Sequence, residues 1–95
     1  MTARSAVMAP AQREQFILDY LARHNLTDVL DAPFVDAYVQ ATGAATAERL
    51  IGAPQCLTLS RDLASLHRRG LLTRQSASVG GGPGWPTWVY VYSLA

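Results

Sequence analysis

The chain has 95 residues, of which 49% are apolar and 16% charged, and its formal net charge is +1. This length holds one domain with one modest core, too small for a deep enzymatic cleft, and the apolar content excludes an intrinsically disordered chain. The single cysteine excludes a disulfide framework and a cysteine-based zinc site, and no apolar run approaches the roughly 20 residues of a membrane span.

The start of the chain is small and polar. Residues 1–9 are predicted to form a mobile tail ahead of a single domain over residues 10–95. The tail lacks the apolar stretch of a secretory signal. We therefore expect a cytoplasmic protein.

Two helices are predicted in the first half. Apolar residues recur at helical spacing over residues 11–25, and the same spacing returns over residues 34–42. The second helix is expected to open at Asp31 or Ala32. Between the helices, Leu26–Leu30 is long enough only for a brief strand or a turn.

A third helix is predicted over residues 54–69. One narrow apolar stripe runs along it, formed by Cys56, Leu59, Leu63 and Leu66. Asp62 is placed off this stripe, and Gly70 is expected to stop the helix. Arg68 and Arg69 would complement the negative end of the helix dipole.

Ten residues separate Gly43 from Pro54, which is long for a connection between two packed helices. Either Ala44–Gly52 holds the true second helix or the connection is enlarged. We favour an enlarged connection, with a helical turn around Glu48–Ile51.

The last quarter of the chain predicts a β-hairpin. Leu71–Val79 alternates like a strand, Thr87–Leu94 is rich in β-branched and aromatic residues, and a glycine-rich loop joins them. On the second strand Trp88, Tyr90 and Tyr92 share one face. This aromatic face either covers the core or forms an interface with a second copy or another protein.

The small net charge hides an uneven distribution. Residues 1–50 carry four arginines against six carboxylates, whereas residues 51–95 carry four arginines against Asp62 alone. Every basic residue is an arginine, which suits bidentate contacts to phosphate and guanine, although codon bias would give the same composition. The predicted third helix and the strand after it therefore form the basic part of the chain.

The segment from Leu57 to Arg74 resembles the recognition helix and first wing strand of winged helix-turn-helix transcription regulators, of the broad MarR-like and ArsR-like kind. The residues that carry this resemblance are Ser60, Arg61, Leu63, Leu66, Arg68, Arg69, Gly70, Leu71, Leu72 and Arg74. The resemblance implies an α+β winged helix-turn-helix fold, with three main helices followed by a β-hairpin wing. It also implies a sequence-specific regulator that reads the major groove of double-stranded DNA with helix 54–69.

On this resemblance, the exposed face of the third helix supplies the DNA contacts. Base or phosphate contacts are expected from Gln55, Thr58, Arg61 and Ser65, and phosphate contacts from Arg68, Arg69 and Arg74. The alternative is an ordinary solvated helix face, and the presence of Asp62 argues against dense phosphate packing beside Arg61. The wing tip, Gly80–Gly84, has no basic residue and is better explained as a flexible loop.

A second hypothesis is a winged-helix module that binds protein partners through strand 87–94 and does not bind DNA. On the first hypothesis we expect a homodimer, because one domain cannot easily cover both faces of that strand. No catalytic set is visible, so we expect neither an enzyme nor a cofactor. Cys56 is interpreted as a buried thiol rather than a redox sensor, and His24 and His67 as structural residues rather than metal ligands.

Overall fold

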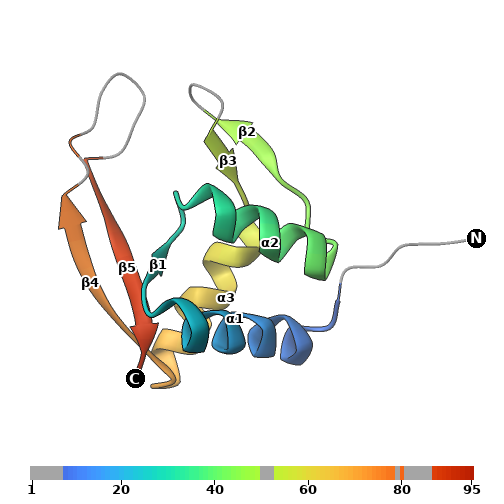
Figure 1. Ribbon diagram of the computed structural model, residues 1–95, viewed down its shortest axis with the longest axis horizontal. Coiled ribbons are helices and arrows are strands. Elements are labelled where there is room, and N and C mark those ends of the chain that lie inside the picture. Colours follow the sequence, from blue (N-terminus) through green and yellow to red (C-terminus); the bar gives the residue numbers. More distant parts are fainter. Residues whose placement is uncertain (1–7, 50–52, 79, 81–86) are drawn as a thin grey trace, which may run out of the picture.

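The computed structural model describes residues 8–49, 53–78, 80 and 87–95. Three helices and a β-hairpin follow one another along the chain in the order expected for a winged helix (Figure 1). The elements are α1 (Pro10–His24), β1 (Thr27–Asp28), α2 (Ala32–Thr42), β2 (Ala47–Arg49), β3 (Ala53–Gln55), α3 (Leu57–Arg68), β4 (Leu72–Ser78) and β5 (Trp88–Leu94). The predicted α+β winged-helix fold is confirmed.

The first two helices begin and end where local chemistry favours it. Pro10 stands at the first position of α1, where its missing N–H costs nothing. The side chain of Asp31 caps α2 by accepting a hydrogen bond from the N–H of Phe34, and Gly43 ends that helix with a φ of 77°. Most of the predicted tail over residues 1–9 lies outside the described residues, but Met8 donates its N–H to the carbonyl of Thr42 (2.8 Å).

The sheet has three antiparallel strands in the order β1-β5-β4. β5 pairs with β4 along its whole length, from Leu72 opposite Leu94 to Ser78 opposite Trp88. On its other side it pairs with β1, where Thr27 lies opposite Tyr92. Of the two alternatives for Leu26–Leu30, a brief strand or a turn, the structure has a two-residue strand, and it pairs with the edge of β5 that faces away from β4.

The connection between α2 and α3 differs from the prediction. The predicted helical turn around Glu48–Ile51 is wrong over its described residues, because Ala47–Arg49 pairs with Ala53–Gln55 as a two-stranded antiparallel sheet. Pro54 lies in β3, opposite Glu48, so α3 begins at Leu57 and not at residue 54. A short hairpin thus replaces the tight turn of a standard helix-turn-helix.

One core cluster joins the helices to the wing. Every helix contributes buried residues to it, and so do β4 and β5, through Leu72 and Tyr92. The aromatic face of β5 is divided by this arrangement: Tyr92 is buried, Tyr90 is half-buried and Trp88 is exposed. No helix of the described chain is long and apolar enough to span a membrane.

Candidate nucleic-acid interface

The amphipathic pattern of α3 fixes which of its sides faces outward. Leu59, Leu63 and Leu66 are buried in the core cluster, where α3 packs against α1 and β4. Cys56 immediately precedes the helix and is also buried, as predicted for an inert thiol. The opposite side of α3 is left to the solvent.

That outward side carries the residues expected to contact DNA. Arg61 is exposed, and Thr58 and Ser65 lie half-buried one turn before and after it. Positions 58, 61 and 65 follow helical spacing, so their side chains form one stripe. Gln55 is placed differently, because it belongs to β3 and lies opposite Ala47.

Asp62 is buried although the sequence pattern placed it off the apolar stripe; it is only 5% exposed. Its carboxylate accepts two hydrogen bonds from Arg13 of α1, Nε to Oδ2 at 2.9 Å and Nη2 to Oδ1 at 3.1 Å. It accepts a third from the hydroxyl of Tyr38 on α2, at 2.5 Å. One carboxylate therefore ties α3 to both other helices.

The same contacts determine the ionisation of the partners. Burial raises the pKa of the Tyr38 hydroxyl, and the hydrogen bond to Asp62 raises it further. The hydrogen bond to Asp62 also raises the pKa of Arg13. Arg13 stays charged and Tyr38 stays protonated, so the guanidinium of Arg13 lies within hydrogen-bond distance of Asp62 and compensates its charge.

The three remaining arginines of the predicted site have different surroundings. Arg68 is exposed in the last turn of α3, and no ion pair of the described residues involves it. Arg69 follows the helix and pairs with Glu14 of α1, with 2.6 Å between Nη2 and Oε2. Arg74, on β4, stacks over the ring of Tyr90 with its guanidinium carbon 3.9 Å from the ring centroid.

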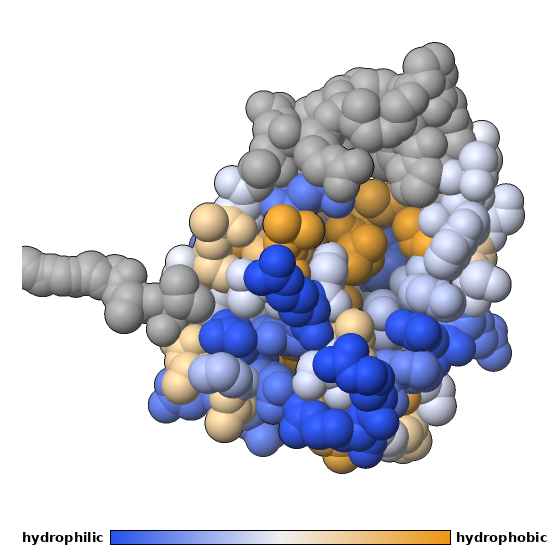
Figure 2. All heavy atoms as spheres, turned by 180° about the vertical axis from the view of Figure 1, so that it is seen from behind, coloured by the Kyte–Doolittle hydropathy of each residue, from blue (hydrophilic) through white to orange (hydrophobic). Residues whose placement is uncertain are grey.

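Figure 2 shows the side of the molecule that lies behind Figure 1, where α3 is nearest to the viewer. Hydrophilic side chains gather in its lower half, where α3 ends and turns into β4. Hydrophobic side chains gather above them, between the two hairpins. The well-exposed large apolar residues include Leu57 at the start of α3 (68%) and Trp88 on β5 (50%).

The two histidines have ordinary surroundings. His24 stacks on Tyr20, with 4.1 Å between ring centroids, and His67 lies half-buried in the last turn of α3. Within the described ranges no group of three or more His, Cys, Asp or Glu side chains could hold a metal ion. Of the predicted loop Gly80–Gly84, only Gly80 lies among the described residues.

Sequence reasoning missed the Arg13–Asp62–Tyr38 cluster. The position of Asp62 around the helix axis could have revealed this cluster. Asp62 follows Leu59 by three positions and precedes Leu66 by four, which places it on the inward side of the helix. Comparison of the chain with models of known families, with curated proteins and with solved structures gives no match.

Proposed function

We propose that the protein binds double-stranded DNA and reads the major groove with the outward side of α3. The observation that carries this proposal is the charge of that side. Asp62, the one carboxylate of the helix, is buried and paired with Arg13, so Arg61 and Arg68 face the solvent with no acidic side chain beside them on α3. The cationic and small polar side chains of this side suit the donor and acceptor pattern of the groove, although Leu57 in the first turn is also exposed.

The roles of the residues follow from their positions. Arg61 would donate to a guanine edge, and Thr58 and Ser65 would contact neighbouring bases or phosphates. Arg68 and Arg74 would hold the phosphate backbone, Arg74 from the wing strand. Arg69 would have to exchange Glu14 for a phosphate, and Gln55 would contribute from β3 rather than from the helix.

The resemblance to MarR-like and ArsR-like regulators gives this binding a role in the control of transcription, in the cytoplasm. A homodimer would present two copies of α3 to two half-sites separated by about one turn of DNA, roughly 10 base pairs. The pseudo-palindromic site would then mirror the symmetry of the protein.

A protein-binding module is the competing proposal, and one observation favours it. Leu57 and Trp88 are large, apolar and well exposed. Figure 2 also shows hydrophobic side chains gathered between the two hairpins, and a continuous exposed apolar patch often belongs to a protein interface. A partner protein could then dock between the hairpins, in place of DNA.

A binding titration separates the two proposals. A duplex selected from a random pool is titrated with the protein at ~50 mM salt, where phosphate contacts are strongest. Arg61→Gln is expected to weaken binding by about 5- to 150-fold, the discrimination given by one bidentate base contact. The matched control is Arg23→Gln, which removes the same charge from an exposed position on α1 and is expected to leave affinity within about twofold.

Two results would overturn DNA binding. The first is an absence of any selected duplex or measurable affinity for the wild-type protein. The second is an equal loss in both variants, because net charge rather than the α3 surface would then control binding.

A further inference from the structure

β4 is an edge strand. It pairs with β5 on one side, and no strand of the described chain pairs with its other side. Figure 1 shows β4 as the outermost element, with α3 on the inward side. A free strand edge presents a row of unpaired N–H and C=O groups and is a template for another strand.

The hydrogen-bond pattern shows which residues of β4 direct these groups outward. Ala95 donates its N–H to the carbonyl of Leu71, which extends the β4–β5 ladder by one pair (3.1 Å). In an antiparallel ladder, hydrogen-bonded residues alternate with residues that point their N–H and C=O away from the partner. The outward-pointing residues are therefore Leu72, Arg74, Ser76 and Ser78.

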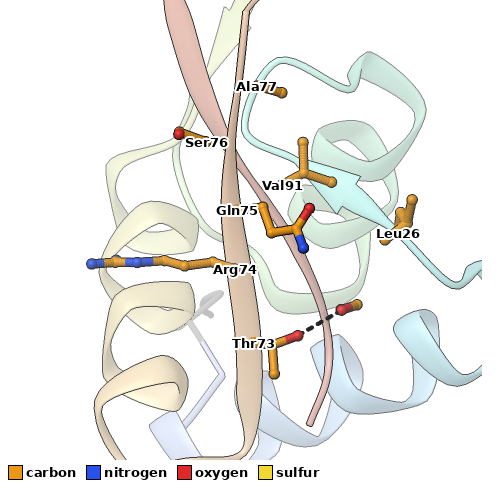
Figure 3. Close-up of a pocket in the computed structure, with 8 residues that line it drawn as sticks. Leu26, Thr73, Arg74, Gln75, Ser76, Ala77 and Val91 are labelled. Atoms are coloured by element: carbon orange, nitrogen blue, oxygen red, sulfur yellow. Dashed lines mark hydrogen bonds between the residues drawn. The ribbon is translucent and has the colours of Figure 1, made fainter.

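Several of the devices that natural proteins use to protect an edge are missing from the residues of β4. It contains no lysine, proline or acidic residue, and its register with β5 runs unbroken from Leu72 to Ser78, without a bulge. Its one charged side chain, Arg74, is folded over the Tyr90 ring of β5. Figure 3 shows Arg74 and Ser76 on one side of β4, and Gln75 and Ala77 on the other.

We propose that β4 pairs antiparallel with β4 of a second copy of this chain, about a two-fold axis at Gln75. In this register Leu72 lies opposite Ser78 of the second copy and Arg74 lies opposite its Ser76. The four outward-pointing residues thus lie opposite each other, and the three residues between them also lie opposite each other, as an antiparallel ladder requires. The only charged residue of the strand lies directly opposite a small hydroxyl residue, and its side chain is folded over the Tyr90 ring of its own copy, so no like charges lie directly opposite each other.

A second copy fits this edge better than an unrelated peptide because the outer face of the sheet also continues across the axis. β4 and β5 line a hollow of about 290 Å³ on that face, between Gln75, Val91 and Leu26 (Figure 3). Leu26 is 60% exposed there. A two-fold axis perpendicular to the sheet places both hollows on one face of a continuous six-stranded sheet.

The dimer gives the proposed DNA-binding protein its two copies of α3, but it does not depend on DNA binding. The wild-type protein is measured by sedimentation equilibrium over about 1–200 µM, together with Ser76→Lys and Ser76→Glu. Ser76 is exposed, so both variants should fold, which circular dichroism verifies. Lysine would lie opposite Arg74 of the other copy and glutamate would pair with it, each contact occurring twice per dimer.

Ser76→Lys is expected to raise the dissociation constant of the dimer about tenfold, while Ser76→Glu leaves it unchanged or lowers it. A monomeric wild-type protein at every concentration would overturn the proposal, as would equal effects of the two substitutions. Arg61→Gln is expected to dimerise like the wild-type protein. A failure of DNA binding and a failure of dimerisation are therefore seen in separate measurements.

Discussion

Asp62 links the packing of the three helices to the charge of the molecular surface. Its carboxylate receives hydrogen bonds from Arg13 and Tyr38, which belong to the two other helices. Because those bonds hold one side of α3 against α1 and α2, they also fix the rotation of the helix about its axis. Arg61, the next residue back along the chain, is turned to the solvent by the same rotation.

The first prediction concerns the loss of this carboxylate. Asp62→Ala leaves the guanidinium of Arg13 and the hydroxyl of Tyr38 without their buried partner. The free energy of unfolding should fall by about 3 kcal/mol, the low end for breaking a buried ion pair because Arg13 keeps some contact with water. Urea unfolding measures this loss. Asp36→Ala, an exposed position on α2, should change stability by no more than about 0.5 kcal/mol, and equal effects of the two variants would refute the role given to Asp62.

The second prediction concerns alkaline pH. Burial and the hydrogen bond to Asp62 raise the pKa of Tyr38 above its ordinary value of 10.0. The unfolded chain therefore loses this proton at a lower pH than the folded protein does. Stability is fully present below about pH 10 and falls as the pH rises from there towards the raised pKa. Burial also raises the pKa of Tyr20, which acts in the same direction.

Tyr38→Phe tests this assignment because it removes the titrating hydroxyl. The variant should be less stable than wild type at pH 8 yet lose less further stability between about pH 10 and pH 11. Urea unfolding at a series of pH values gives both slopes. Parallel slopes for the variant and the wild type would show that another group controls the alkaline loss.

At the scale of elements, the sequence predicts α1, α2 and the wing to within a few residues because each is marked by its own local pattern. Helical spacing identifies both helices, and the alternation and aromatic content identify β4 and β5. The connection before α3 has no such pattern. Ala47–Arg49 contains no β-branched or aromatic residue, so its pairing with β3 depends on tertiary context rather than on propensity.

Pro54 explains the misplaced start of α3. A proline after a glycine and an alanine is typical of the first turn of a helix, and the sequence alone gives no reason to prefer a strand. A two-stranded sheet tolerates proline because each strand has one free edge. The partners of Asp62 were unpredictable for a related reason: Arg13 lies 49 positions away in the chain, and only the packing of α1 on α3 brings them together.

At the scale of the whole molecule, the pair between Arg13 and Asp62 sharpens the separation of charge along the chain. The pair occupies one arginine of the acidic first half and the only carboxylate side chain of the second half, so neither contributes a free charge to the surface. Four arginines remain in residues 51–95, on or next to α3 and on β4. The small net charge of +1 is therefore compatible with a cationic surface on one side of the protein.

This layout predicts how DNA affinity depends on salt. Each phosphate contact contributes about −0.9 to the slope of log affinity against log salt concentration. With four arginines available, and one of them paired with Glu14, the slope should lie between about −2.7 and −3.6 for each subunit. Arg68→Gln should make the slope shallower by about 0.9, because Arg68 is exposed and has no competing ion pair among the described residues. Arg23→Gln changes the net charge equally but lies on α1, and it should leave the slope as it is. Titrations at four or more salt concentrations between about 50 and 200 mM give these slopes. If both variants reduced the slope alike, the binding would follow net charge, and the basic surface of α3 and β4 would not be the site.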